Sequence, residues 1–449
     1  MLAGLNKSPL LTDLYQLNML QAYLDHGRTE TAVFELFFRK LPPQRGFLLA
    51  AGLEQALEFL ADVSFAEEEL DWLRHSGRFS RDLLDYLASF RFRGEVHAMP
   101  EGTVFFADEP ILRVTAALPE AQLVETRLIN LLHFQTLVAS KAARMVLAAP
   151  GKQLIDFGLR RAHGAEAGLL AARASYLAGF AGSATLIAEP VFRIPVFGTM
   201  AHSFVQASAG ESAAFLDFAR SRPRNLTLLI DTYDTEAGAR KVVALEPRLR
   251  EEGIALAAVR LDSGDLGALS RKVRAILDQG GLGSVRIFAS GGLDEDAIAD
   301  LLAAGAPIDG FGVGTSLTTS FDLPALDCAY KLQEYAGVAR RKLSTGKATW
   351  PGRKQVFRCY DAAGRIASDV LTLESDTQPG ETLIELVMKD GKLVGPRRSL
   401  AESRTMAAAG LASLPAALRA LNPVASLPVQ IAPALAALTA AVDRRLSDA

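Results

Sequence analysis

The sequence predicts an α/β protein: an irregular, TIM-like α/β barrel joined to an N-terminal α+β domain that is completed by C-terminal strands and helices. Three observations favour this class. Short apolar runs alternate with amphipathic helical stretches through the middle of the chain, and nearly every run ends in polar residues or glycine. The segments on either side carry short strand patterns instead. Runs that are apolar on both faces and separated by helices indicate a parallel sheet covered by helices.

The bulk composition limits the partners of the protein. A chain of 449 residues is long enough for roughly two or three domains. Its formal net charge of −3 leaves no basic excess for a nucleic acid, and Cys328 and Cys359 suit a reducing compartment without forming a metal motif. Residues 1–12 contain no signal-peptide core, and prolines interrupt the uncharged stretch 420–442, which favours a loop and a surface helix. We therefore expect a cytoplasmic protein that binds neither nucleic acid nor a membrane.

The first predicted domain covers residues 1–118. Residues 10–27 have the leucine stripe of a helix, and TAVFELFFRK has the β-branched and aromatic content of a strand. A helical stretch then precedes three strand candidates, GEVHAMP, GTVFFAD and PILRVTA. Residues 339–449 contain further strand candidates, ARRKLS, KQVFRCY, ETLIELVMK and KLVGP, and an alanine-rich helix. We expect this C-terminal part to pack on the N-terminal domain.

The predicted barrel covers residues 119–338. A long helix over residues 120–148 leads into the apolar runs KQLIDFG, SATLIA, TLLIDTYD, ALAAVRLDSGD, VRIFASGG and IDGFGVGT. This succession of polar strand ends favours a closed or nearly closed barrel over an open doubly wound sheet. In a barrel, chemistry is expected on the loops that leave the C-terminal ends of the strands.

The run VRLDSGD carries a residue pair that suits a sugar phosphate. Alternation along a strand places Arg260 and Asp262 on the same face, where the carboxylate can accept from two hydroxyls and the guanidinium can bind a phosphate. The alternative is a structural ion pair at a strand end. Asp265 by itself is typical of a helix N-cap.

Two glycine turns follow late strands of the predicted barrel. Gly291 and Gly292 end one run, and Gly314 and Thr315 end the next. Glycine lets backbone N–H groups approach a phosphate closely, and late strands are where barrels commonly bind phosphate. The alternative is that each is only a tight turn. The sequence contains no P-loop motif.

Other candidates are weaker when each is taken alone. In DFGLRR, Phe157 and Arg160 suit a flat anionic aromatic substrate, although a core ring and a solvated arginine would leave the same pattern. Tyr15 and Arg39 favour an interface or structural role over ligand binding. His202, just past a Gly-Thr turn, is either a capping or buried histidine or a reactive group at the mouth of the barrel.

Taken together, these motifs resemble the nicotinate phosphoribosyltransferase family. The matching pieces are TDLYQLNM, FELFFRKLPPQRGFLLAAGLE, DFGLRR, GTMAHSFV, LIDTYDT, VRLDSGDL, ASGGLDE and GFGVGTSL, which occur in family order between residues 12 and 319. The resemblance implies ATP-dependent transfer of phosphoribosyl from phosphoribosyl pyrophosphate to nicotinate, which yields nicotinate mononucleotide and diphosphate for NAD biosynthesis. It also implies Mg²⁺ on the diphosphate, ATP as a co-substrate, and a homodimer with shared active sites.

The resemblance also assigns roles to single residues. His202 is implied as the phosphohistidine. The implied nicotinate-binding residues are Tyr15, Phe157, Arg160 and Thr199. The implied phosphoribosyl pyrophosphate-binding residues are Arg39, Arg260, Asp262, Gly291, Gly292, Gly314 and Thr315; no residue is implied as a metal ligand by a direct motif.

Two alternatives remain open at the level of the sequence. A nicotinamide phosphoribosyltransferase would place an aspartate after the threonine of the Gly-Thr turn to hold the amide, and here that position is Met200. The other alternative is a non-catalytic barrel that binds nicotinate or a nucleotide.

Overall fold

The computed structural model describes residues 8–422 and 427–448, so part of the predicted proline-rich loop and most of the N-terminal stretch lie outside the described residues. The chain forms two compact units, residues 1–140 with 325–449 and residues 141–324. These boundaries differ from the predicted ones at residues 119 and 338. The difference at the second boundary arises because β12 (Cys328–Tyr335) pairs with β1 (Thr31–Phe38) in the first unit.

The first unit is built on a seven-stranded antiparallel sheet. Its order is β13 (Val338–Ala339), β12, β1, β5 (Pro110–Ala117), β3 (Glu95–Ala98), β17 (Glu385–Lys389) and β18 (Lys392–Leu393). A four-stranded sheet contains β16 (Glu381–Thr382), β14 (Lys354–Tyr360), β15 (Ile366–Leu373) and β19 (Val429–Ile431), and β2 (Leu48–Leu49) pairs with β4 (Val104–Phe105). The predicted strand ARRKLS is wrong beyond Ala339, because no ladder pairing continues there.

The helices of the first unit match most of the predicted helical segments. They are α1 (Leu14–Asp25), α2 (Leu53–Asp62), α3 (Glu67–Ser76), α4 (Arg81–Ala88), α5 (Leu118–Leu123), the first part of α6 (Glu125–Ala148), α15 (Leu400–Ser413), α16 (Ala416–Arg419) and α17 (Pro433–Ser447). The long helix predicted over residues 120–148 is interrupted at Val124. Of the predicted stripe Leu10, Leu14, Leu17 and Leu24, only Leu17 is buried and Leu14 is exposed, while Leu20, outside that stripe, is the other buried leucine of α1.

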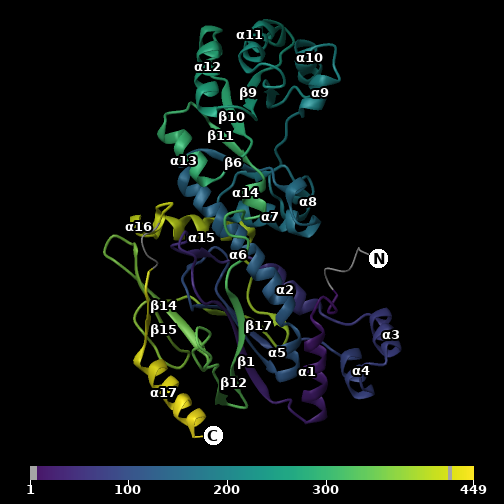
Figure 1. The fold of residues 1–449 in the computed structure, drawn as a ribbon, viewed down its shortest axis with the longest axis vertical. Helices are drawn as coiled ribbons and strands as arrows, with labels where there is room; N and C mark the ends of the chain where they lie inside the picture. Colours follow the sequence, from purple (N-terminus) through teal and green to yellow (C-terminus); the bar gives the residue numbers. More distant parts are fainter. Residues whose placement is uncertain (1–7, 423–426, 449) are drawn as a thin grey trace. The chain divides into compact units, whose positions relative to one another are not determined.

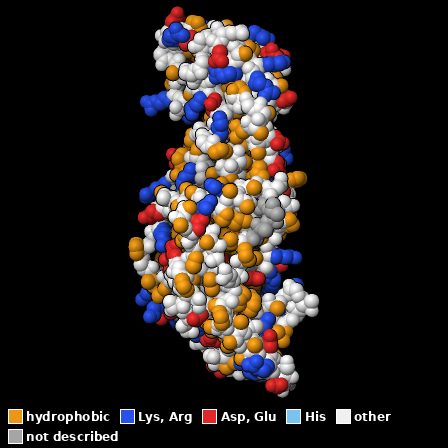
Figure 2. All heavy atoms as spheres, turned by 90° about the vertical axis from the view of Figure 1, so that its left-hand side faces the viewer, with side chains coloured by type: hydrophobic (Ala, Val, Ile, Leu, Met, Phe, Trp, Pro, Cys, Tyr) orange, Lys and Arg blue, Asp and Glu red, His pale blue; other side chains and the backbone are white. Residues whose placement is uncertain are grey.

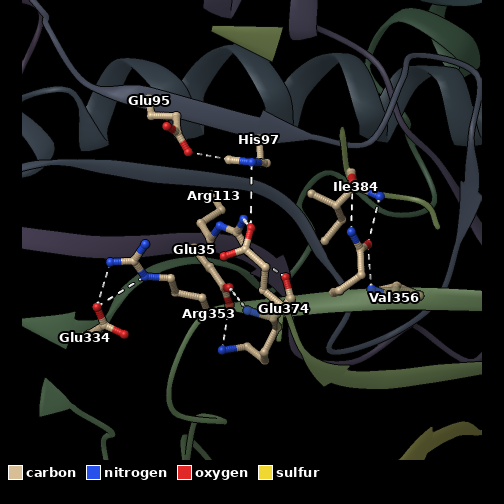
Figure 3. Close-up of polar contacts among 11 residues, drawn as sticks. Glu35, Glu95, His97, Arg113, Glu334, Arg353, Val356, Glu374 and Ile384 are labelled. Atoms are coloured by element: carbon tan, nitrogen blue, oxygen red, sulfur yellow. Dashed lines mark hydrogen bonds and ion pairs between the residues drawn. The ribbon is translucent and has the colours of Figure 1, made fainter. Parts of the chain in front are cut away.

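β17, from the C-terminal part, pairs with β3 of the N-terminal sheet, in agreement with the predicted packing of the two parts. Buried charges also join them (Figure 3). Lys354 Nζ lies 2.6 Å from Glu35 Oε2, and both side chains are almost completely buried. Burial lowers the pKa of Lys354, and the Glu35 carboxylate opposes that effect. Arg113 pairs with Glu374, which also lies near His97. Pairs of this kind add little net stability, but removing one partner is strongly destabilising because it leaves a buried charge uncompensated.

Asp108, beside the sheet, is expected to make stability depend on pH. Burial, opposed by Arg39 and assisted by Asp327, raises the pKa of Asp108 to about 6. A carboxyl whose pKa is raised in the folded state destabilises that state once it ionises, so the penalty is absent below about pH 4 and complete above about pH 6. We therefore expect Asp108→Asn to be more stable than the parent by about 1 kcal/mol at pH 7.5, after allowance for solvent screening.

Denaturant unfolding at pH 7.5 and pH 4.5 checks this expectation, and the difference between the two proteins should shrink markedly at the lower pH. Asparagine also tolerates the left-handed backbone of Asp108, whose φ is 64°, so the substitution adds no strain. Equal stability at pH 7.5 would mean that attraction to Arg39 cancels the cost of burial.

The second unit contains a six-stranded parallel sheet (Figure 1). Its order is β7 (Gly182–Ser183), β6 (Gln153–Asp156), β11 (Gly310–Val313), β10 (Arg286–Ser290), β9 (Leu256–Leu261) and β8 (Leu226–Leu229). The prediction of a parallel sheet is confirmed by the ladders. The predicted closed ring is not observed in the described part of the chain, where β7 and β8 are the edge strands of a half-barrel.

The run SATLIA is the one predicted barrel strand that is largely wrong. Only Ser183 of this run lies in a strand, and Ala188 already begins α8 (Ala188–Phe192). The backbone N–H of Ala184 donates to the carbonyl of Asp156, and Thr185 N–H turns back to donate to Ser183 Oγ, which ends the strand. Periodicity could not reveal this side-chain competition.

Helices connect the strands of this unit, and the three that follow β8, β9 and β10 are capped by aspartates. The connecting helices are α7 (Ala165–Ala178), α9 (His202–Gln206), α10 (Glu211–Ser221), α11 (Thr235–Glu251), α12 (Leu266–Gln279), α13 (Glu295–Ala303), α14 (Thr315–Thr318) and the short 3₁₀ turn η2 (Leu159–Arg161). Asp234, Asp265 and Asp294 accept from the backbone N–H three residues later, which confirms the predicted cap at Asp265. These caps fix where the loops after β8, β9 and β10 end.

The surface carries interspersed charges. Figure 2 shows Lys and Arg side chains mixed with Asp and Glu over the visible face, without a broad patch of one sign. Within residues 8–422 and 427–448, the helices include none with the length and hydropathy to cross a bilayer.

Candidate active site

Arg260 and Asp262 form the centre of a hydrogen-bonded network at the end of β9. Arg260 Nη2 donates to Asp262 Oδ1 at 2.9 Å, its Nε donates to Ser290 Oγ at 2.8 Å, and its Nη1 donates to Thr199 Oγ1 at 3.1 Å. Ser290 Oγ in turn donates to Asp262 Oδ1 at 2.6 Å. The predicted common face of Arg260 and Asp262 is therefore observed, and the pair links the ends of β9 and β10 to Thr199 in the loop before α9.

Asp262 is held as a carboxylate. Burial raises its pKa, but the hydrogen bond from Ser290, the charge and hydrogen bond of Arg260, and nearby His202 outweigh burial, so the pKa lies below the usual range. The ionised form is therefore maintained at every pH above that depressed value. An ionised carboxylate can accept from sugar hydroxyls or bind a cation.

His202 is the first residue of α9 and faces this network. Its Nε2 lies 3.8 Å from Asp262 Oδ2, and its Nδ1 lies 3.1 Å from Thr232 Oγ1. The side chain is 38% exposed, so the imidazole is accessible to a ligand. The alternative of a histidine buried in the core is wrong, because the ring borders a cavity.

The turn at Gly291 requires glycine for two reasons. Its φ is +95°, and a Cβ at this position would lie 2.1 Å from the carbonyl oxygen of Asp262. Gly292 follows with φ +63°, and a Cβ there would meet no atom within 4 Å, so this second glycine borders open space. Gly291 therefore packs tightly against the Asp262 backbone, and the backbone of Gly292 borders open space that a ligand can approach.

Phe157 owes its position to a glycine on the next strand. A Cβ on Gly312 would lie 2.5 Å from the Phe157 ring, so the ring occupies the space that a side chain at 312 would take. The Arg260 guanidinium lies over this ring at 5.2 Å from its centroid. Upstream, the buried carboxylate of Asp156 accepts from Ser183 Oγ at 2.6 Å and from Gly158 N–H at 2.7 Å, which fixes the turn. Burial raises the pKa of Asp156, and these hydrogen bonds oppose the rise.

Two of the cavities in this unit share the lining residues Phe157, Arg160, Arg260 and Asp262. The larger, about 540 Å³, is lined by Phe157, Leu159, Arg160, Ala184, Gly198, Thr199, Met200, Ala201, His202, Leu229, Arg260 and Asp262. The smaller, about 200 Å³, is lined by Phe157, Arg160, Arg161, Arg260, Asp262, Ser290, Gly291, Gly292, Leu293, Gly312, Gly314, Thr315 and Ser316. The Phe157 ring and the arginines border both cavities, and the glycine turns that suit phosphate border only the smaller one.

Tyr15 and Arg39 belong to the first unit, and only their contacts within that unit are considered. Tyr15 is exposed on α1, where Gln16 Nε2 donates to its hydroxyl at 3.0 Å. Arg39 follows β1 and forms an ion pair with Asp327 at 2.7 Å. Their roles in ligand binding stay predictions.

Asp231 and Thr232, at the end of β8, are site residues that the sequence did not single out. Asp231 Oδ2 accepts from Asp262 N–H at 2.8 Å and from Ser263 Oγ at 2.6 Å. Its other oxygen, Oδ1, is buried and has no hydrogen-bond partner among the described residues. The polar ending of LIDTYDT was the available signal, since it marks the loop at the same edge of the sheet.

The half-barrel, with cavities lined by residues at the C-terminal ends of its strands, is typical of an α/β enzyme. Residues 10–133 match the family model of the nicotinate phosphoribosyltransferase N-terminal domain, and residues 152–355 match that of the nicotinate phosphoribosyltransferase family. The chain belongs to the nicotinate phosphoribosyltransferase family.

Individual relatives support the same assignment. A nicotinate phosphoribosyltransferase of Mycobacterium tuberculosis is 50% identical over 414 residues, which cover 92% of this chain and 89% of the relative. The Bacillus subtilis nicotinate phosphoribosyltransferase is 42% identical over 357 residues, 78% of this chain and 72% of the relative. The crystal structure of human nicotinic acid phosphoribosyltransferase superposes with a TM-score of 0.84 at 31% identity, covering 96% of this chain and 99% of that one.

Proposed function

We propose that this protein transfers the phosphoribosyl group of phosphoribosyl pyrophosphate to nicotinate, with ATP as a co-substrate, and releases diphosphate and nicotinate mononucleotide for NAD biosynthesis. The observation that carries this proposal is that the Arg260–Asp262–Ser290 network, the Gly291-Gly292 turn and His202 all line two cavities that share residues. Family membership supports the same reaction.

The chemical demands of the transfer match the residues present. Displacement at the anomeric carbon needs an aligned pyridine nitrogen, stabilisation of the departing diphosphate, and exclusion of water. Phe157, Arg160 and Thr199 line the larger cavity and would orient nicotinate. Arg260 and Asp262 would hold the ribose and its 5′-phosphate end, while Gly291, Gly292, Gly314 and Thr315 would bind phosphate oxygens through their backbone in the smaller cavity.

A magnesium ion fits this donor set when it arrives with the diphosphate. Mg²⁺ in such sites takes one or two protein carboxylates together with phosphate oxygens and water. Asp262 is an ionised carboxylate, and the buried Oδ1 of Asp231 has no hydrogen-bond partner among the described residues, so these two side chains would hold the ion. When bound, the ion neutralises charge on the leaving diphosphate.

His202 would accept the γ-phosphoryl group of ATP. Its neutral imidazole attacks phosphorus through a ring nitrogen, the N–P bond forms, and the bond to the bridging oxygen breaks so that ADP leaves. The phosphoryl group would then stand beside Asp262, near the site proposed for the diphosphate. Hydrolysis of this phosphohistidine would drive the reversible transfer forward.

The proposal also covers the oligomeric state and the cellular location of the protein. We infer a homodimer in the cytoplasm, in which the partner subunit's Tyr15 stacks on nicotinate opposite Phe157 and the partner subunit's Arg39 contacts phosphoribosyl pyrophosphate. The half-barrel would then be an irregular form of the TIM barrel, with its chemistry at the C-terminal strand ends.

Met200 favours the acid over the amide as substrate. Its side chain is buried and lines the larger cavity, where it offers no carboxylate to accept from an amide nitrogen. A carboxylate at this position would instead repel nicotinate.

The direct test incubates the purified protein with phosphoribosyl pyrophosphate, ATP and Mg²⁺, and measures diphosphate release with nicotinate or with nicotinamide. The expected result is nicotinate mononucleotide with the acid and at least about 100-fold slower turnover with the amide. Equal rates would favour the nicotinamide enzyme, and binding of nicotinate without diphosphate release would identify a non-catalytic barrel.

A further inference from the structure

A buried charge cluster lies behind the Gly291-Gly292 turn, outside the residues assigned above. Lys141 and Arg144, one turn apart on α6, hold the carboxylate of Glu295, the first residue of α13. Lys141 Nζ lies 2.6 Å from Glu295 Oε2, and Arg144 Nε donates to Glu295 Oε1 at 2.8 Å. The Lys141 and Glu295 side chains are only 3% and 2% exposed.

The same lysine also reaches a second segment. Lys141 Nζ lies 2.7 Å from Asp322 Oδ1, just beyond the end of α14. Glu295 lies three residues after Gly292, which lines the smaller cavity with Gly291, and α14 supplies Thr315 to the same cavity. One ammonium group is therefore bonded to the ends of both segments that border the phosphate cavity.

Such a cluster is poorly explained by stability alone. Burying an ion pair costs desolvation that its attraction only partly offsets, so hydrocarbon side chains of similar volume would often serve as well. Burial raises the pKa of Glu295, but the charge and hydrogen bond of Lys141 and the hydrogen bond of Arg144 outweigh it and hold the pKa below its usual range. The carboxylate is therefore charged at neutral pH, and its geometry is defined by two cations.

We propose that Lys141 is a positioning residue for the phosphoribosyl donor: through Glu295 and Asp322 it sets the separation of the two backbone segments that bind phosphate. We call Lys141, Arg144, Glu295 and Asp322 the Lys141 clamp. The proposal rests on the proposed function, because it assigns these segments to phosphoribosyl pyrophosphate. The four clamp residues do not line the larger cavity, which is the one proposed for nicotinate, so loss of the clamp should weaken the donor site selectively.

The experiment compares Lys141→Met and Glu295→Gln with the parent protein in steady-state kinetics. We expect KM for phosphoribosyl pyrophosphate to rise about tenfold in each variant, while KM for nicotinate stays within about twofold. Asp322→Asn weakens the second ion pair of Lys141 and leaves the pair with Glu295 in place, so it should give a smaller rise. Because Lys141 and Glu295 act as one unit, the double variant should be little worse than either single variant.

A matched pair elsewhere in the unit provides the control. Glu211, 1% exposed at the start of α10, lies 2.8 Å from Lys241 and lines neither cavity. Glu211→Gln should lower Tm without changing KM for phosphoribosyl pyrophosphate. If the clamp variants behave like this control, the cluster is structural only and the proposal is wrong.

Two further results distinguish a failure of the proposed function from a failure of the clamp proposal. Absence of nicotinate mononucleotide with the parent protein would contradict the proposed function itself and, with it, the role of the clamp. If Lys141→Met and Glu295→Gln do not fold, Asp322→Asn decides, and an unchanged KM for phosphoribosyl pyrophosphate in that variant overturns the proposal.

Discussion

Replacing His202 by alanine is expected to abolish the stimulation of transfer by ATP, so that the ratio of the rate with ATP to the rate without it falls to about one. The physical reason is that His202 is the accessible imidazole at the rim of the cavity, with Nε2 3.8 Å from Asp262. The ATP-independent transfer should survive in part, because Arg260 and the glycine turns remain.

The measurement is diphosphate release with and without ATP, together with incubation in γ-labelled ATP and mapping of acid-labile phosphate. His75→Ala is the control, since His75 lies on α3 and bonds only to the Asp71 carbonyl in the described structure. That control should retain both the label and the stimulation. Persistent ATP stimulation in His202→Ala would show that another group accepts the phosphoryl.

Replacing Arg260 by leucine should have the other large effect, a fall in kcat/KM for phosphoribosyl pyrophosphate of about 100- to 1000-fold. The side chain donates to Ser290, Thr199 and Asp262 at once, and its guanidinium lies over Phe157. Its removal leaves the Asp262 carboxylate without its cationic partner and takes a positive charge from both cavities.

Arg260→Lys separates charge from geometry. Lysine keeps the positive charge but lacks the planar fork that reaches several acceptors, so it should recover less than about a tenth of the parent kcat/KM. Thermal unfolding of both variants tests whether the fold is retained. A lysine variant with full activity would reduce the role of Arg260 to a point charge, and an unaffected leucine variant would exclude it from donor binding.

Much of the second unit could be predicted because its signals are local. Strands buried on both faces carry continuous apolar runs. Because side chains alternate along a strand, Arg260 and Asp262, two residues apart at the end of β9, point to the same face. The N-cap at Asp265 was predictable for the same reason, since a cap depends on the next three residues only.

The parts that could not be predicted depend on contacts distant in sequence. Nothing near Asp231 reveals that its carboxylate accepts from the Asp262 backbone, and nothing near Lys141 reveals Glu295. The pairing of β12 with β1 likewise joins segments far apart along the chain, which is why the domain boundary was placed too late. SATLIA misled the prediction because a serine side chain, rather than the pattern, ends that strand.

The interlocking of Gly312 with the Phe157 ring has a consequence for how such sequences diverge. Because a Cβ at position 312 would lie 2.5 Å from that ring, neither position can change freely by itself. A lineage that enlarges residue 312 must first shrink residue 157 or shift its backbone. These two sites should therefore co-vary among descendants, and libraries that randomise one of them should diversify both together.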